Sequence, residues 1–169
     1  FEDTKSAQLG AYLPTDLEMD ADETVTWVID PEDYKADVLF VFENGRVARV
    51  ALSGYATKTN RKRLKNAIYG GSKLMYATVL KEERDLALVS SDFRLVNFNT
   101  SLLKTKTTNS TQGVQALTIK GSRTVTMVGT AEEFIGGKAQ VEKFRAEKLP
   151  SAGAPMKETD MKSLFDLEE

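Results

Sequence analysis

A unit of short strands that occurs twice in succession is the feature that most limits what this sequence folds into. In the first copy, an apolar run, a turn and a return segment follow one another at Val38–Phe42, Asn44-Gly45 and Arg46–Leu52. The same order recurs at Leu86–Ser90, Asp92-Phe93 and Arg94–Phe98, at a constant offset that places Val38 on Leu86 and Arg46 on Arg94. Because the apolar run, the turn, the arginine and the return segment all match, the sequence predicts two copies of one β unit.

The first hairpin has clear local signals. Val38–Phe42 is a continuous apolar run, and its short length fits a strand buried on both faces better than a helix. Asn44-Gly45 supplies the positive φ values that a two-residue hairpin turn requires. Arg46–Leu52 is therefore predicted to return antiparallel to the first strand.

Further strands are predicted after each hairpin, at Lys73–Leu80, Val114–Ile119 and Arg123–Val128. Beyond the hairpins the offset becomes smaller, which matches Leu74 with Val114 and gives the first copy about eight extra residues in its loop. A period of about 40–50 residues with roughly four short strands in each copy is typical of propeller blades. We therefore expect an all-β fold with two tandem β-propeller-type blades over residues 24–135, flanked by partial strands.

The two ends of the chain have a different character. Residues 1–23 form an acidic segment, in which Tyr12, Leu13 and Leu17 favour a short helical turn. Thr24–Ile29 is β-branched and aromatic and is predicted as a strand. The tail, residues 136–169, loses the strand pattern. A short helix is predicted within it at Thr159–Leu167, with an apolar stripe of Met161, Leu164 and Phe165.

The charges are strongly segregated along the chain, although the net charge is only -2. Residues 1–37 hold 11 acidic and 2 basic residues, whereas residues 38–131 hold 5 acidic and 15 basic ones. From Arg46 to Lys81 there are nine Lys or Arg and no acid. Natural surfaces normally mix both signs, so this concentration indicates a polyanionic partner, of which nucleic acid is the commonest.

Several classes of enzyme are disfavoured by what the sequence lacks. It contains no Cys and no His, which removes a thiolate nucleophile, the usual base of a catalytic triad and the common zinc ligands. The carboxylates at Asp20, Asp22 and Glu23 and at Glu132-Glu133 do not have the spacing of a metal-binding loop. We therefore expect a binding protein without a catalytic residue, metal or cofactor.

The candidate nucleic-acid-binding residues are the cations of the two loops and the arginines of the return strands: Lys58, Arg61, Lys62, Arg63, Lys65, Lys104, Lys106, Arg46, Arg49 and Arg94. Lysine and arginine bind phosphates without reading base sequence. Adjacent blades are expected to bring the loops around 57–65 and 104–106 side by side in one curved positive track. For Arg46 and Arg94 an ion pair with a nearby carboxylate, such as Glu43 or Asp92, is an equally good interpretation.

Two stretches of the sequence resemble a known family. "VLFVFENGRVARVALSGYATKTNRKRL" (38–64) and "LALVSSDFRLVNFNTSLLKTKTTNSTQGVQAL" (86–117) resemble blades of the C-terminal domain of bacterial type IIA topoisomerase A subunits. These are the A subunits of DNA gyrase and topoisomerase IV, and the likeness is strongest to the gyrase-A-like proteins of Gram-positive bacteria. It extends from about Leu9 to about Gly153.

The resemblance implies a β-pinwheel, a propeller variant in which neighbouring blades exchange strands, here as an incomplete propeller fragment. It implies a non-catalytic domain whose positive rim binds duplex DNA. It also implies, as partners, the remainder of the A subunit and the ATPase B subunit, and a cytoplasmic, nucleoid-associated location. Open sheet edges in such a fragment suggest a homodimer as well. The Gln-Arg-Arg-Gly-Gly-x-Gly box of gyrase is absent, so guiding or bending of DNA fits better than tight wrapping.

Two hypotheses of function follow from the sequence. The first is a DNA-binding blade pair that serves a topoisomerase. The alternative is a propeller-type protein-interaction module whose basic face binds an acidic protein. In either case the acidic flanks of the chain are able to fold over the basic face and to lower its affinity for an external polyanion.

Overall fold

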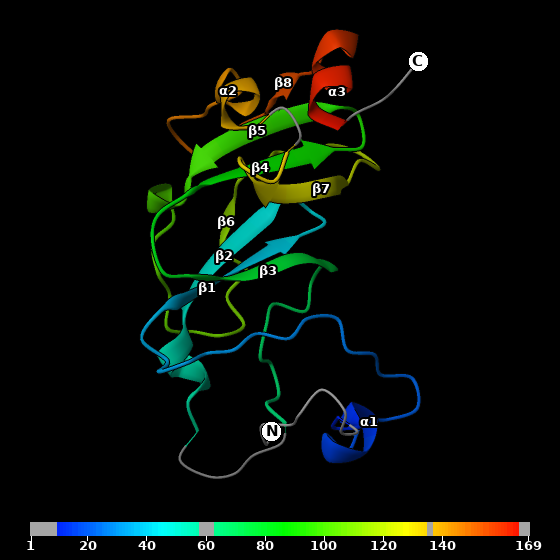
Figure 1. Cartoon of the computed structure of the whole chain (residues 1–169), viewed down its shortest axis with the longest axis vertical. Coiled ribbons are helices and arrows are strands. Elements are labelled where there is room, and N and C mark those ends of the chain that lie inside the picture. Colours follow the sequence, from blue (N-terminus) through cyan, green and yellow to red (C-terminus); the bar gives the residue numbers. More distant parts are fainter. Residues whose placement is uncertain (1–9, 58–62, 135–136, 166–169) are drawn as a thin grey trace. The chain divides into compact units, whose positions relative to one another are not determined.

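The computed structural model describes residues 10–57, 63–134 and 137–165 of the 169-residue chain, with side chains up to Lys162 (Figure 1). The chain divides into two compact units. The first combines residues 1–28 with residues 57–65, and the second comprises residues 29–56 and 66–169. Lys58, Arg61 and Lys62 of the predicted DNA-binding set lie outside the described residues.

In the described part of the first unit there is one short helix, α1 (Leu13–Asp16), with Pro14 in its first turn. This confirms the helical turn that was predicted there. The strand expected at Thr24–Ile29 is wrong, because these residues have no regular secondary structure. A strand needs a neighbouring edge that pairs with it, and in the described part of the chain no strand pairs with this segment. Val25 and Val28 are accordingly exposed.

The second unit is built on two antiparallel four-stranded sheets (Figure 1). The first has the order β3-β1-β2-β6, and its strands are β1 (Asp37–Phe42), β2 (Arg46–Ala51), β3 (Leu74–Leu80) and β6 (Val114–Gln115). The second has the order β7-β4-β5-β8, and its strands are β4 (Asp85–Ser90), β5 (Arg94–Asn99), β7 (Val125–Thr130) and β8 (Ala154–Pro155). Short 3-10 helices, η1 (Leu52–Tyr55) and η2 (Thr100–Leu102), follow β2 and β5.

The two sheets are linked by an exchanged strand. Strand β6 lies in the connection between β5 and β7, yet it pairs with β2 of the first sheet. Strand β8 comes from the tail and pairs with β5 in the corresponding position of the second sheet. The expected all-β fold of two tandem four-stranded units is confirmed, including the exchange of a strand between neighbours.

The hairpin turns differ from the predicted two-residue type. The Gly45 amide donates to the Phe42 carbonyl at 2.9 Å, and Gly45 has a φ of +78°. Three residues thus separate β1 from β2, and of the Asn44-Gly45 pair only the glycine is left-handed. In the second hairpin Phe93 takes the place of Gly45: its amide donates to the Ser90 carbonyl at 2.9 Å, and its φ is +56°.

The repeat is confirmed for the hairpins and corrected beyond them. Phe42 pairs with Leu74, and Ser90, the equivalent of Phe42 in the second hairpin, pairs with Val125. Leu74 therefore corresponds to Val125, and its predicted match with Val114 is wrong. Val114 is instead the equivalent of Ala154, because they pair with Val47 and Leu95. The predicted strand at Val114–Ile119 is reduced to the two residues of β6.

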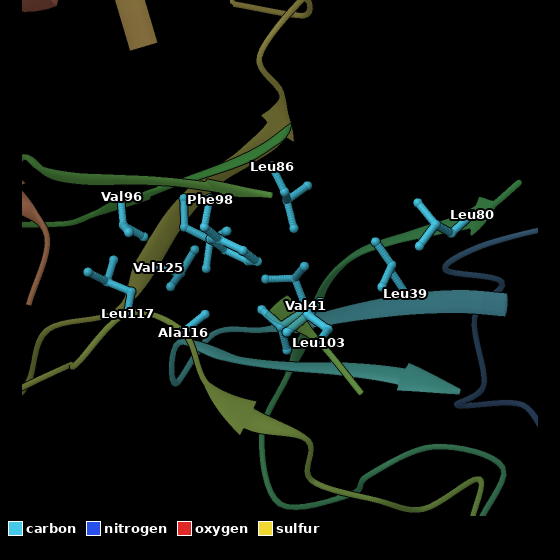
Figure 2. Close-up of a cluster of buried hydrophobic side chains, with 12 residues drawn as sticks. Leu39, Val41, Leu80, Leu86, Val96, Phe98, Leu103, Ala116, Leu117 and Val125 are labelled. Atoms are coloured by element: carbon cyan, nitrogen blue, oxygen red, sulfur yellow. The ribbon is translucent and has the colours of Figure 1, made fainter. Parts of the chain in front are cut away.

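A buried apolar cluster joins the two sheets (Figure 2). The first sheet contributes Leu39, Val41, Val47 and Leu80, and the second contributes Leu86, Leu88, Val96 and Phe98. Residues 38–42 are all buried, as predicted for a strand covered on both faces. In the tail, α2 (Gly137–Glu142) supplies Val141 to a second cluster, against which Met161 of α3 (Glu158–Phe165) packs. The predicted tail helix is confirmed, and within the described residues no helix is long and apolar enough to cross a membrane.

Candidate nucleic-acid interface

Two cations of the predicted set, Lys104 and Lys106, lie in the connection from β5 to β6. The Lys106 amide donates to the Arg49 carbonyl, and the Lys106 carbonyl accepts from the Ala51 amide, both at 2.9 Å. These bonds place Lys106 beside Val50 of β2. Strand β6 pairs with the other end of β2, at Arg46 and Val47. Lys104 and Lys106 are both exposed. Two lysines are thus presented from a backbone that is itself fixed to a sheet edge.

The remainder of this connection is anchored and free of acidic residues. The Thr105 hydroxyl donates to Asp37 at 2.7 Å, and the Asn109 side-chain amide donates to the Gly54 carbonyl at 3.0 Å. Thr107 and Thr108 are exposed and carry hydroxyls of the kind that bind phosphate oxygens. We therefore define residues 104–113 as the second-loop surface, whose only charged side chains are those of Lys104 and Lys106.

Arg63 and Lys65 belong to the first unit, and both are exposed. Arg63 contacts three acidic residues of that unit: Nη1 lies 3.3 Å from Asp20, and Nη2 lies 2.5 Å from both the Glu23 carboxylate and the Glu18 carbonyl. Since the lysines of the second-loop surface belong to the second unit, the single curved track of both loops stays a prediction.

Arg46 and Arg94 occupy equivalent positions and make equivalent contacts. Arg46 Nη1 donates to the Gly113 carbonyl at 3.3 Å, whereas Arg94 donates to the carbonyls of Ala152 and Gly153 at 2.8 and 2.5 Å. These acceptors immediately precede β6 and β8. The contacts described are thus to backbone oxygens of the incoming strand rather than to the predicted carboxylates. Asp92 pairs instead with Arg123, at 3.1 Å.

Arg49 is largely buried and is paired with two carboxylates of the protein. Its side chain is 17% exposed, with Nε 2.6 Å from Asp37 and Nη1 2.7 Å from Glu83. Burial lowers the pKa of Arg49 and the two carboxylates raise it, with a net upward shift. Its geometry is that of a structural ion pair at the junction of β1, β2 and the β3–β4 turn. Both carboxylates therefore compete with an external phosphate for this guanidinium.

One further cation is placed on this kind of loop and was missed from the sequence. Lys148 is exposed and precedes Ser151, which bonds Ala116 and Thr118 on either side of Leu117. The alignment that relates Val114 to Ala154 also relates Thr108 to Lys148, but the exposed Glu147 stands next to Lys148, so this part of the tail carries both signs of charge. The one signal for Lys148 in the sequence is its charge, and the adjacent Glu147 offsets that charge.

A polar cleft of about 550 Å³ lies where β4 begins, and it carries both signs of charge. Asp85, whose side chain is 3% exposed, lies 2.7 Å from Arg145 and 3.7 Å from Lys138. Burial acts to raise the pKa of Asp85, but Asn99, Arg145 and Lys138 lower it, with a net downward shift. In the described part of the chain, no group of three or more acidic residues is arranged to hold a metal ion. The cations Arg145 and Lys138 of this cleft are thus paired with an acid of the protein itself.

Comparison with known proteins identifies the architecture. No protein-family model and no curated protein sequence matches the chain. Among solved structures, the C-terminal domain of DNA topoisomerase IV matches with a TM-score of 0.62 and 20% sequence identity. The chain has the fold of a topoisomerase IV C-terminal domain. The match covers 73% of this chain and 39% of the topoisomerase IV domain, so the chain corresponds to less than half of that domain.

Two other solved structures are similar to the chain at a lower level. A DNA gyrase A C-terminal domain has a TM-score of 0.46 and 18% identity, over 60% of this chain and 33% of that one. The E. coli ParC C-terminal domain has a TM-score of 0.41 and 12% identity, over 60% and 42%. The fold expected from the resemblance to topoisomerase blades is thus confirmed by the topoisomerase IV match.

Proposed function

We propose that this chain is a DNA-binding part of the C-terminal domain of a type IIA topoisomerase A subunit. The observation that carries the proposal is the second-loop surface: two exposed lysines and exposed threonines on a backbone fixed along β2, with no acid among them. Such a surface suits the phosphate backbone, because cations and hydroxyls supply the contacts that position a protein on a duplex. The topoisomerase IV fold supports the same function.

The proposed contacts are Lys104, Lys106 and Lys148 in the second unit, together with Arg63, Lys65 and the outlying Lys58, Arg61 and Lys62. Arg46, Arg49 and Arg94 have a different role in this proposal, because their described bonds go to the protein itself. They hold the strands from which the loops project. With no base-reading element proposed, sequence preference arises only from the deformability of the DNA.

In the parent enzyme this domain guides or bends duplex DNA for strand passage and has no catalytic residue of its own. Its proposed partners are duplex DNA, the remainder of the A subunit and the ATPase B subunit, in the bacterial cytoplasm at the nucleoid. Homodimerisation through sheet edges is a further proposal. It concerns β3 and β7, which are the outer strands of their sheets opposite the exchanged ones.

A filter-binding titration of the full chain against duplex DNA at several salt concentrations tests this function. Each phosphate contact contributes a slope of about -0.9 to the dependence of log affinity on log salt. A slope of about -3 or steeper, with little difference between unrelated duplexes, is the expected result. Absence of binding at low salt contradicts the proposal and favours the alternative, an acidic protein as the partner of the basic face.

A further inference from the structure

The acidic N-terminal segment binds Arg63, one cation of the predicted basic loop (57–65). Residues 16–23 contain five acids and no base. Within them Glu23 bonds both the Asp20 amide, at 2.8 Å, and Arg63 Nη2, at 2.5 Å. The Asp20 carboxylate and the Glu18 carbonyl also contact Arg63, so three oxygens of residues 18–23 lie around a single guanidinium. We define residues 18–23 as the acidic turn.

These contacts engage N–H donors of Arg63 that a DNA phosphate would also bind. A guanidinium binds carboxylates and phosphates through the same planar set of N–H groups. Both terminal nitrogens of Arg63 are engaged by the acidic turn, through Nη1 to Asp20 and Nη2 to Glu23. A phosphate therefore has to displace these oxygens before it binds Arg63 in the same way.

We propose that the acidic turn is an internal competitor that lowers the affinity of the chain for DNA by occupying Arg63. The inference rests on the proposed DNA-binding function and names a regulation of that same site. It differs from a general charge effect, because it assigns the effect to two carboxylates in contact with one arginine. Other acids of residues 1–37 contact other partners: Glu32 pairs with Lys81, and Asp33 pairs with Lys35.

The size of the effect follows from the exposure of the pairs. The side chains of Arg63, Asp20 and Glu23 are 46%, 72% and 45% exposed, so water and salt screen their attraction. Exposed pairs are individually weak, and DNA brings several phosphates at once. We therefore expect the turn to lower DNA affinity about three- to tenfold at low salt, an effect that shrinks towards physiological ionic strength.

The test compares two double variants of the full chain that lose the same charge. Asp20→Asn/Glu23→Gln keeps the shape of the turn and neutralises its carboxylates, whereas Glu32→Gln/Asp33→Asn neutralises two acids whose described partners are Lys81 and Lys35. Affinity for a short duplex is measured by filter binding at low salt and at about 0.15 M salt. We expect the first variant to bind about three- to tenfold more tightly than the second, and the gain to vanish in an Arg63→Ala background.

Equal affinities of the two variants, or a gain that survives Arg63→Ala, would overturn the inference while leaving DNA binding intact. If no variant binds DNA, the proposed function fails, and the inference fails with it. The contact itself has a separate readout, the NMR signal of the Arg63 guanidinium without DNA. This signal is expected to shift in Asp20→Asn/Glu23→Gln and to stay in place in Glu32→Gln/Asp33→Asn. An unchanged signal in the first variant also contradicts the proposal.

Discussion

Arg94 holds the tail strand β8 in the same way that Arg46 holds the exchanged strand β6, although these strands come from different parts of the chain. Arg94 donates to the Gly153 carbonyl at 2.5 Å, and Arg46 donates to the Gly113 carbonyl at 3.3 Å. The two glycines have φ values of +65° and +66° and lead directly into β8 and β6. The tail thus supplies the fourth strand of the second sheet, as the connection between β5 and β7 supplies the fourth strand of the first.

Replacement of Arg94 by alanine should loosen the tail more than it affects the rest of the fold. The variant loses donors to the carbonyls of Ala152 and Gly153, and a hydrogen bond from a charged group is worth about 1.5–3 kcal/mol. Because Arg94 is only half-buried, we expect a loss of about 1–3 kcal/mol in the free energy of unfolding. Hydrogen exchange should accelerate at the Met156 amide, which bonds the Phe93 carbonyl.

Arg123→Ala is the matched control for this change. It removes an arginine whose ion pair with Asp92 is partly exposed, and such pairs contribute little to stability. Chemical denaturation measures the loss of unfolding free energy in both variants, and Arg94→Ala should lose more than Arg123→Ala. Equal losses of stability, or an unchanged exchange rate at Met156, would contradict the assignment of Arg94 to the tail strand.

The hairpins could be predicted from the sequence because their signals are local. A short apolar run, a turn residue able to adopt a positive φ and a return strand follow one another directly, and Val38–Phe42 and Leu86–Ser90 are both strands as expected. Strands β6 and β8 have two residues each and gain their partners from distant parts of the chain. Their sequences carry no alternation long enough to reveal a strand, so their pairing was not predictable.

The candidate site was predictable in its charge and not in the role of each cation. The absence of acids around Lys104 and Lys106 is visible in the sequence, and both are exposed. Arg49 was grouped with them, but Asp37 and Glu83, which bind it, are 12 and 34 residues away. Only the register of β1 against β2 and β3 brings these acids to Arg49, and a count of charges along the chain does not contain that register.

Asp85 should make the stability of the protein depend on pH in the acid range. Burial opposes ionisation, but Asn99 and Arg145 hold the pKa of Asp85 below its usual value. A carboxylate with a lowered pKa stabilises the folded state above its unfolded pKa of about 3.9, and this contribution is lost as pH falls through the folded pKa. Asp85→Asn is therefore expected to lose about 1–3 kcal/mol at neutral pH.

The difference between wild type and Asp85→Asn should disappear as the pH is lowered below the folded pKa, because the wild-type carboxylate is then neutral as well. Urea denaturation at a series of pH values measures it. Asp33→Asn is the control, since its partner Lys35 is highly exposed and the change should have little effect on stability at any pH. A constant difference across the pH range would show that Asp85 contributes by shape and not by charge.

The lysines of the second-loop surface should determine part of the salt dependence of DNA binding. Lys104→Ala/Lys106→Ala removes two proposed phosphate contacts, so the slope of log affinity against log salt should become shallower by about 1.8. Lys81→Ala/Lys143→Ala removes the same charge from lysines that pair with Glu32 and Asp160, and it should change the slope less. Filter binding over a series of salt concentrations compares them. Equal slopes for the two variants would remove the second-loop surface from the interface.

Gly45 and Phe93, at equivalent turn positions, should respond in opposite ways to substitution. A Cβ on Gly45 would lie 2.1 Å from the Leu117 carbonyl oxygen, in a backbone conformation with φ of +78°. The Gly45 carbonyl also accepts bonds from the Ala116 and Leu117 amides, so movement of this turn displaces the segment that carries β6. Gly45→Ala is expected to cost at least about 2 kcal/mol, because left-handed strain and a backbone clash add together.

Phe93 has the same left-handed conformation, but its side chain is exposed, at 54%. Phe93→Gly relieves strain of about 1–2 kcal/mol and incurs an entropy cost of about 0.5–1 kcal/mol for the more flexible unfolded chain. The net expectation is a stabilisation of up to about 1 kcal/mol, measured by the midpoint of thermal or urea unfolding. The sign of the effect is the decisive result: destabilisation by Phe93→Gly would mean that the phenyl ring contributes contacts exceeding the strain of its backbone. A neutral Gly45→Ala would mean that the exchanged strand tolerates displacement from the first hairpin.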